Sequence, residues 1–235
     1  MRKIISTKLK FVLIGKNDDY FKKIIFFLKK KQIKFEHLYI DKSFTHKNIF
    51  NFLKTKNYDY LISYRNPLIL KKKILKIANK YNVNFHPSPP RYRGVGGYNL
   101  AILNSDKEYG VTAHLINNQI DNGLIIDFIK FKISKKITLK KLISETRKLQ
   151  FNQIKKVLNY LISKELNLQL LTNRNKKKNY KWSKKIFYLK ELEKLYRINI
   201  KDIKIKNLSK IIRSTCIDEF KPEIIIDKYR FVLLD

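Results

Sequence analysis

Short apolar runs alternate with amphipathic segments along the first third of the chain. The apolar runs have the length of buried strands, and the amphipathic segments repeat their hydrophobic residues at helical spacing. Strands are expected at residues 9–15, 35–40, 58–64 and 82–85, and helices at residues 18–31, 45–53 and 70–81. This alternation predicts an α/β fold with a Rossmann-like, mostly parallel sheet, right-handed crossovers and flanking helices.

A stretch rich in proline and glycine interrupts the pattern at residues 87–97. It can form neither a helix nor a central strand, because proline has no backbone N–H to donate. Regular elements resume after it, with a short helix expected at residues 98–104, strands at 109–116 and 124–133, and a long amphipathic helix at 138–163.

The composition changes again near residues 164–180. The polar and charged run at residues 173–179 predicts a linker or an exposed loop. Helices are expected beyond it around residues 189–195 and 208–213, and a terminal hairpin at residues 223–226 and 229–234. We therefore expect a larger domain at residues 1–165 and a small subdomain at residues 166–235. The subdomain, a helical and β-hairpin appendage, is too short for a strong core and should lean on the larger domain.

Composition restricts the class of protein. The chain has 235 residues, of which 44% are hydrophobic, so it belongs with globular proteins. It contains no apolar run of about 18 residues, and its basic start lacks the apolar region of a secretory signal. The single cysteine, Cys216, excludes an internal disulfide and a cysteine metal cluster. We expect a cytoplasmic protein without a membrane partner.

The formal net charge of +34 is open to two interpretations. A basic surface attracts nucleic acid and other polyanions. However, lysine is spread along the whole chain at helical spacing beside apolar residues, as on solvated helix faces. A genome rich in A and T would produce the same excess of Lys, Ile and Asn. We favour this explanation and expect no specific nucleic-acid partner.

The ends of the predicted strands indicate where a ligand would bind. Ligands of open α/β sheets lie beyond the carboxyl ends of the strands. Ser63-Tyr64-Arg65 and Asn84-Phe85-His86 both lie at such ends. The first strand ends at Gly15 without the G-x-G-x-x-G loop, so a bound NAD is not supported.

Asn84, His86 and Asp121 are the best candidates for catalysis. Strand alternation places Asn84 and His86 on one face. An amide, an imidazole and a carboxylate suit the attack of an amine on a carbonyl: the amide binds the oxyanion, and the other two handle charge and protons. Taken singly, His86 could be a structural histidine in a proline turn, and Asp121 a plain turn residue before Asn122 and Gly123.

The residues around the candidates carry a resemblance. The motifs are NFHPSPPRYRGVGGYN at residues 84–99, YGVTAH at 109–114 and IDNG at 120–123. In this order and spacing they resemble the folate-dependent formyltransferase family, densely over residues 58–130 and loosely over the rest of the first 165. The resemblance implies 10-formyltetrahydrofolate as the formyl donor, an amine as the acceptor, and Asn84, His86 and Asp121 as the catalytic set.

The resemblance also suggests binding residues. For the folate they are Ser63, Tyr64, Arg65, Leu70 and Asn117, and for the acceptor Tyr92, Gly96, Gly97, Asn99 and Trp182. Thr112 and His114 would support the catalytic residues. Simpler roles stay open: His114 as a structural histidine, the glycines as turn residues and Trp182 as an anchor for the tail. The histidines lack metal-ligand spacing, so no metal is expected.

Two features favour one branch of the family. His86-Pro87-Ser88-Pro89-Pro90 has the short paired-proline form, and Gly96-Gly97-Tyr98-Asn99 follows it. Both resemble nucleotide-sugar N-formyltransferases, which implies a dTDP-linked 4-amino-4,6-dideoxyhexose as acceptor, a role in O-antigen biosynthesis, and a homodimer as one expected assembly. The alternatives are a methionyl-tRNA formyltransferase, and a basic nucleic-acid-binding protein on an inactive formyltransferase scaffold.

Overall fold

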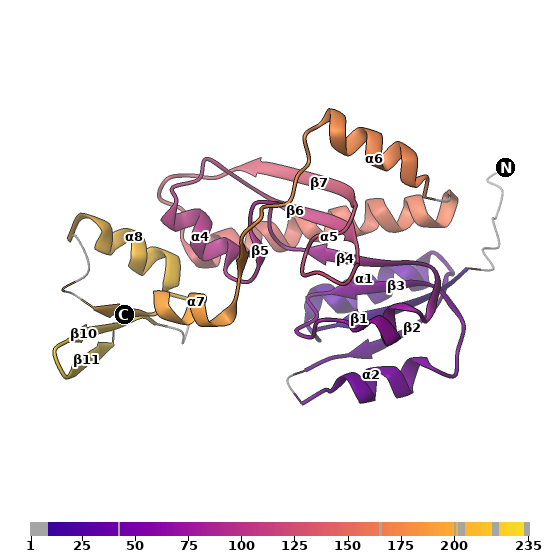
Figure 1. Cartoon of the computed structure of the whole chain (residues 1–235), viewed down its shortest axis with the longest axis horizontal. Helices are drawn as coiled ribbons and strands as arrows, with labels where there is room; N and C mark the ends of the chain where they lie inside the picture. The colour runs from indigo at the N-terminus through magenta and orange to yellow at the C-terminus, as the bar shows by residue number, and fades with distance from the viewer. Residues whose placement is uncertain are drawn as a thin grey trace.

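A six-stranded sheet forms the centre of the protein (Figure 1). The structure, a computed structural model, describes residues 9–41, 43–164, 166–199, 201, 205–217 and 221–232. The strand order is β2-β1-β3-β4-β6-β7. These strands are β1 (Lys10–Gly15), β2 (Lys34–Tyr39), β3 (Tyr58–Tyr64), β4 (Ala78–His86), β6 (Glu108–Leu115) and β7 (Ile125–Lys132). The first four are mutually parallel, whereas β6 is antiparallel to both β4 and β7, so the predicted mostly parallel α/β sheet is confirmed.

Helices cover both faces of the sheet. They are α1 (Asp19–Lys30), α2 (His46–Leu53), α3 (Lys72–Leu75), α4 (Gly97–Leu103) and α5 (Leu139–Ser163). Three of them begin where the sequence offers a capping side chain: Asp18, Thr45 and Thr138 each accept a backbone N–H of the first turn. Such caps satisfy donors that a helix start otherwise leaves without partners.

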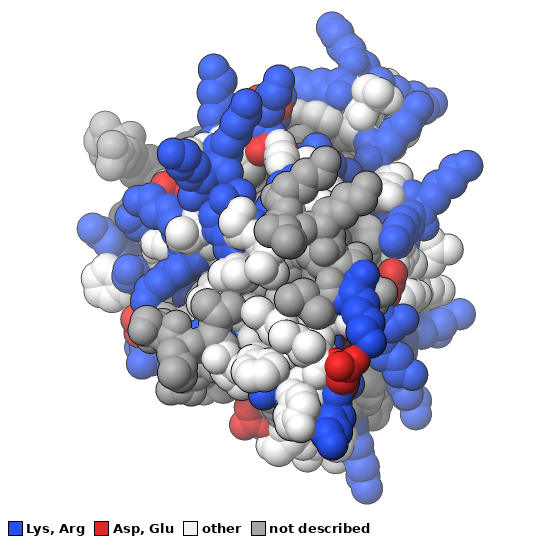
Figure 2. Space-filling model, turned by 90° about the vertical axis from the view of Figure 1, so that its left-hand side faces the viewer, with Lys and Arg blue, Asp and Glu red and all other residues white. Residues whose placement is uncertain are grey.

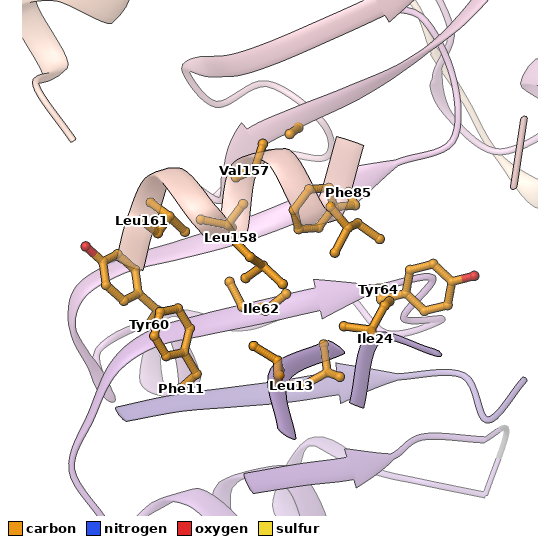
Figure 3. Close-up of a cluster of buried hydrophobic side chains, with 14 of the residues drawn as sticks. Phe11, Leu13, Ile24, Tyr60, Ile62, Tyr64, Phe85, Val157, Leu158 and Leu161 are labelled. Atoms are coloured by element: carbon orange, nitrogen blue, oxygen red, sulfur yellow. The ribbon is translucent and has the colours of Figure 1, made fainter. Parts of the chain in front are cut away.

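The larger core lies between the sheet and the pair α1 and α5 (Figure 3). Phe11, Ile62 and Phe85 reach it from the strands, and Ile24 and Leu158 from the helices. A second cluster fills the opposite face beneath α2 and α3. The strands are therefore anchored on both faces, which holds their carboxyl ends in fixed positions.

The C-terminal part of the chain begins with α6 (Leu168–Lys177), which lies beside β7, and β8 (Ile186–Phe187). The elements that follow form a lobe beside α4, on the left in Figure 1: α7 (Leu189–Leu195), β9 (Arg197–Asn199), α8 (Ile205–Thr215), β10 (Glu223–Ile226) and β11 (Tyr229–Val232). Strands β9, β10 and β11 form a second sheet. Asn99 in α4 donates a hydrogen bond of 2.6 Å to the carbonyl of Ser214 in α8, so the lobe leans on the larger domain.

Three sequence predictions need correction. The helix expected at 70–81 is only the four-residue α3, and β4 begins at Ala78 instead of residue 82, because its ladder with β3 extends back to a Tyr58–Ala78 pair. The polar run at 173–179 is no linker, since α6 continues through Lys177. In addition, the hydrophobic pattern of the sequence did not predict the short strand β9. The hairpin is confirmed within the described residues, and the predicted end of its second strand, at residues 233–234, lies outside them.

α6 lies over the exposed edge of the main sheet. Arg174 in this helix donates to the carbonyls of Ile125 and Ile126 in the edge strand β7. An edge strand otherwise presents carbonyls without partners, so this contact explains why the charged segment packs there. The predicted boundary between residues 165 and 166 stays a prediction. None of the helices in the described part of the chain is long and apolar enough to cross a membrane.

Gly15 provides a test of the packing at the end of β1. A Cβ at this position would lie 1.9 Å from the carbonyl oxygen of Tyr64 in the adjacent strand. Neither backbone can move without disturbing the ladder between β1 and β3. We predict that Gly15→Ala lowers the free energy of unfolding by at least about 2 kcal/mol, measured by urea denaturation. The exposed neighbour Lys16→Ala is the control and should change it little; equal effects would contradict the packing argument.

Candidate active site

The register of three strands brings the predicted polar residues together. In the parallel ladder of β3 and β4, Ser63 lies opposite Asn84. In the antiparallel ladder of β4 and β6, Asn84 lies opposite His114. Phe85 points into the core (Figure 3), so Asn84 and His86 share the other face of β4 as predicted.

The carboxylate of Asp121 lies among these side chains. Asp121 belongs to the loop that follows β6, and its Oδ2 is 3.3 Å from Nδ1 of His86. Its Oδ1 is 3.4 Å from Nε2 of His114 and 3.4 Å from Nδ2 of Asn84. The backbone N–H of Gly94 donates to Oδ2 at 2.8 Å. The structure thus brings together all three predicted catalytic residues and adds His114 as a direct contact of Asp121.

Two backbone carbonyls determine which ring nitrogens of the histidines carry hydrogen. Nε2 of His86 lies 2.7 Å from the carbonyl of Tyr92, and Nδ1 of His114 lies 2.8 Å from the carbonyl of Leu115. A carbonyl only accepts, so these nitrogens must donate. In a neutral ring the other nitrogen then has a free lone pair, and in both histidines that nitrogen faces the carboxylate of Asp121.

Burial and charge shift the pKa values of His86 and Asp121 in definite directions. Burial lowers the pKa of His86, and the negative charge of Asp121 only partly opposes this effect. For Asp121, burial favours the neutral acid, but His86, His114 and the Gly94 amide together hold its pKa below the usual range. The lowered pKa of Asp121 favours an anionic carboxylate at neutral pH, and a bare lone pair on Nδ1 of His86 would repel it, so a proton between the two groups is what makes their contact favourable. One proton can be accommodated between Nδ1 of His86 and Oδ2 of Asp121.

A cavity of about 490 Å³ opens onto these groups. Asn84, His86, His114 and Asp121 all line it. The predicted binding residues that also line it are Ser63, Arg65, Leu70, Gly96, Gly97 and Asn117. Their roles stay predictions, although the cavity places them within reach of one ligand site.

Several predicted binding residues lie outside the cavity lining. The hydroxyl of Tyr64 lies 3.4 Å from Asp18 and donates to it, and Asp18 also forms an ion pair with Arg65. The hydroxyl of Tyr92 donates to Asp106 at 2.6 Å, away from the cavity. The side chain of Asn99 is used in the bond to α8 described above. The geometry gives these side chains supporting contacts within the protein.

Trp182 and Thr112 also occupy supporting positions. The ring of Trp182 packs edge-on against His114, with ring centres 4.9 Å apart, and its Nε1 donates to the carbonyl of Gly123 at 2.8 Å. The hydroxyl of Thr112 donates to the carbonyl of Ser88 at 2.8 Å. Trp182 thus lies behind the catalytic side chains, and its predicted acceptor contact stays a prediction without support from the cavity lining.

Two groups of residues were missed by sequence reasoning. Phe187, Tyr188 and Leu189 form a cavity wall contributed by the C-terminal part of the chain. Tyr188 and Leu189 are 54% and 60% exposed, which is unusual for large apolar side chains and could have been noticed as an apolar run after Lys184 and Lys185. The second is Arg93, which is almost fully buried; it lies within the motif at residues 84–99, but nothing in that motif distinguishes it from the exposed Arg91.

Metal-binding groups were sought among the described residues. No cluster of three or more His, Cys, Asp or Glu side chains that could hold a metal ion occurs within these segments.

The match to a family supports the geometry. A model of the formyl transferase family matches residues 10–158. Because these residues make up more than half of the chain, the chain belongs to the formyl transferase family. The matched region contains the six-stranded sheet, Asn84, His86 and Asp121, and it ends within α5.

Two curated relatives are similar to part of the chain. The bifunctional polymyxin resistance protein ArnA of Wigglesworthia glossinidia brevipalpis is 33% identical over 129 residues, which are 53% of this chain and 20% of the relative. A methionyl-tRNA formyltransferase of Finegoldia magna is 31% identical over 102 residues, 43% of this chain and 33% of the relative. The matches span a third or less of these relatives.

Two solved structures cover nearly the whole chain. A sugar N-formyltransferase from a Shewanella species has a TM-score of 0.74 at 16% identity, covering 97% of both chains. An N-formyltransferase from Helicobacter canadensis, in complex with folinic acid and dTDP-3-aminofucose, has a TM-score of 0.67 at 22% identity, covering 94% of this chain and 86% of that one. At these identities the likeness shows a shared fold, including the C-terminal lobe.

The catalytic assignment predicts a loss of turnover with an intact fold. His86→Ala and Asp121→Asn should each lower kcat of formyl transfer by at least about 100-fold, because positioned acid–base groups contribute about 10²–10⁴-fold. Steady-state kinetics and far-UV circular dichroism of the purified variants test this. Arg91→Lys, which changes an exposed residue, is the control. Turnover like that of the wild type in either variant would remove its proposed role.

The lowered pKa of His86 also predicts how stability depends on pH. In the unfolded chain His86 takes up a proton as the pH falls below about 6.5, whereas the buried ring of the folded protein resists protonation. Lowering the pH therefore lowers the free energy of unfolding. Between about pH 7.5 and 5.5 the free energy of unfolding should fall by about 1 kcal/mol more in the wild type than in His86→Asn. Urea denaturation at both pH values measures this.

The control for the stability experiment is His37→Asn, which removes an exposed histidine. It controls for the loss of a histidine side chain as such. If His86→Asn kept the pH dependence of the wild type, the ring of His86 would not resist protonation in the folded state.

Proposed function

We propose that the protein transfers the formyl group of 10-formyltetrahydrofolate to the amine of a nucleotide-linked amino sugar. The observation that carries this proposal is the meeting of Asn84, His86 and Asp121 at one cavity. Burying a carboxylate beside an imidazole costs free energy. Pairs of this kind, with shifted pKa values, are found mainly at functional sites. Membership of the formyl transferase family supports the same reaction.

In this reaction a C–N bond forms and another breaks. The lone pair of the neutral sugar amine attacks the formyl carbon, and the bond from that carbon to N10 of the folate then breaks. The attacking nitrogen must lose one proton, and N10 must gain one. Asp121 is placed to take the first proton and to share it with Nδ1 of His86 at 3.3 Å before it passes to N10.

The oxyanion of the tetrahedral intermediate needs a hydrogen-bond donor. Nε2 of His86 already donates to the carbonyl of Tyr92, and its Nδ1 faces Asp121. His86 thus has no free N–H directed into the cavity. The amide of Asn84 lines the cavity, and its Nδ2 makes only long contacts, 3.2 Å to Nε2 of His114 and 3.4 Å to Oδ1 of Asp121, which one of its two N–H groups can exchange for the oxyanion; we assign the oxyanion contact to it.

The lining of the cavity combines two kinds of surface. Leu68–Leu70, Ile116 and Ile120 contribute apolar side chains, which suit the flat pterin of the folate. Gly94–Tyr98 and Phe187–Leu189 contribute glycine backbone and aromatic side chains, which suit a sugar nucleotide. The candidate catalytic side chains line the same cavity, where transfer between two bound reactants would take place.

A sugar acceptor is favoured by the extent of the structural likeness. The sugar N-formyltransferase from Shewanella and this protein cover 97% of each other, C-terminal lobe included. The Helicobacter neighbour binds folinic acid and dTDP-3-aminofucose. By analogy we propose a dTDP-linked amino sugar here, with 4-amino-4,6-dideoxyhexose as the first candidate.

Methionyl-tRNA is the second candidate acceptor, because most of the similar curated relatives are methionyl-tRNA formyltransferases and the charge is +34. A tRNA-binding face would gather lysines in a continuous patch. On the face shown in Figure 2, Lys and Arg side chains project around the edge, and the described side chains between them are mostly uncharged. The intact catalytic set argues against an inactive scaffold that only binds nucleic acid.

A panel of acceptors tests the function. The purified protein is incubated with 10-formyltetrahydrofolate and dTDP- or UDP-linked sugars with an amine at C3 or C4, or with methionyl-tRNA. We expect one dTDP-linked amino sugar to gain the mass of a formyl group and tRNA to remain unmodified. Transfer to methionyl-tRNA alone would establish the second candidate, and no transfer to any amine would refute the proposed reaction. Asp121→Asn is the control for background chemistry.

A further inference from the structure

The segment between α6 and α7 contacts the catalytic centre although it lies outside the matched family region. It is the orange chain that descends beside β5 (Arg93–Gly94) in Figure 1. We call residues 181–187 the strap. Its strand β8 pairs with β5 in parallel, with Arg93 opposite Ile186. The N–H of Ser183 donates to the carbonyl of Pro90 at 3.0 Å, and the N–H of Val95 to the carbonyl of Phe187 at 2.9 Å.

Arg93 connects the strap to the loop that carries Asp121. Its side chain is 6% exposed. Nε and Nη2 donate to the carbonyl of Ile120 at 3.1 and 2.7 Å, and Nη1 donates to the carbonyl of Ser183 at 2.9 Å. Ile120 immediately precedes Asp121. The guanidinium therefore fixes the peptide group from which the catalytic carboxylate projects.

Asp121 needs such a hold because its backbone is strained. Its φ is +40°, in the left-handed region that non-glycine residues rarely adopt. A strained conformation persists only where the surroundings determine it, and such positions gather at functional sites. Gly94, the residue after Arg93, donates its N–H to the carboxylate. Two consecutive residues thus hold the backbone and the side chain of Asp121 in place.

Trp182 holds the other end of the same loop. Its Nε1 donates to the carbonyl of Gly123, two residues after Asp121. The chain passes close to β6 there, since a Cβ on Gly123 would lie 1.6 Å from the carbonyl oxygen of Leu115. The indole ring also packs against His114, the second histidine in contact with the carboxylate.

We propose that the strap positions the catalytic carboxylate, with Arg93 and Trp182 as positioning residues that act through Asp121. Arg93 holds the peptide before Asp121, and Trp182 holds the peptide of Gly123 and the ring of His114. The kinetic test of this inference rests on the proposed formyl transfer, because it measures kcat of that reaction. The catalytic centre is therefore completed by a part of the chain beyond residue 158, where the family match ends.

The kinetic experiment uses Arg93→Lys, which keeps the charge but removes the fork that bridges two carbonyls. We expect kcat to fall by about 10- to 100-fold, because a displacement of about 1 Å at the reacting groups can cost that much. KM for both reactants should stay within about threefold, since Arg93 does not line the cavity. The matched control is Arg91→Lys, whose side chain is about half exposed and pairs with Asp106; it should keep the kcat of the wild type.

Combination with Asp121→Asn separates positioning from a general loss of structure. If Arg93 acts through Asp121, Arg93→Lys should change kcat by less than about threefold when Asp121→Asn is already present. An equal fold-loss in both backgrounds, or a kcat like that of the wild type in the single variant, would overturn the inference. Trp182→Phe keeps a ring but loses the donor to Gly123, and it should show the same dependence on Asp121 if Arg93→Lys fails to fold.

Fluorescence provides a readout that needs no activity. Trp182 is the only tryptophan in the chain, so its emission reports the seating of the strap. Arg93→Lys should shift the emission to longer wavelength and increase quenching by acrylamide, whereas Arg91→Lys should change neither. Unchanged emission and quenching in Arg93→Lys would overturn the inference even if no acceptor were formylated. Failure of the acceptor panel alone would refute only the proposed function.

Discussion

The carboxylate of Asp121 is the group on which the rest of the site depends. It is largely removed from water, yet it is kept ionised by His86, His114 and the N–H of Gly94. An isolated buried charge would be strongly unfavourable, so these contacts must be present together. Each comes from a different element: β4, β6 and the loop that contains β5. The positions of three segments are thereby coupled to one ionised group.

The antiparallel strand β6 makes this convergence possible. In a fully parallel sheet the neighbour of β4 would run in the same direction and end with its own loop. Here β6 runs back along β4, so that His114 lies opposite Asn84 and the following loop returns Asp121 to the same place. On the other side, Ser63 at the end of β3 forms the next part of the cavity. The site is thus located where the sheet changes from parallel to antiparallel.

Much of the fold was predictable because hydrophobic periodicity reflects burial directly. The strands β1 and β3 and the helices α1, α2 and α5 all agree with the sequence pattern. The pattern failed where tertiary contacts decided. Ile74 and Ile77 have a spacing that fits a longer helix, but the ladder with β3 converts residues from Ala78 onward into strand. α6 has a polar sequence and forms over the edge strand β7.

The sequence alone determined which candidate residues carry groups able to bind an oxyanion or move a proton, and the face that Asn84 and His86 share, since strand alternation is local. It could not determine which neighbours complete the site. Arg93 meets the Asp121 loop across 27 residues of sequence and Trp182 meets it across 59, where the chain returns to pair β8 with β5. Such contacts depend on register and on the path of the whole chain, which no local pattern records. Tertiary structure therefore decided that Trp182 lies behind the catalytic side chains and that Tyr188 forms the cavity wall.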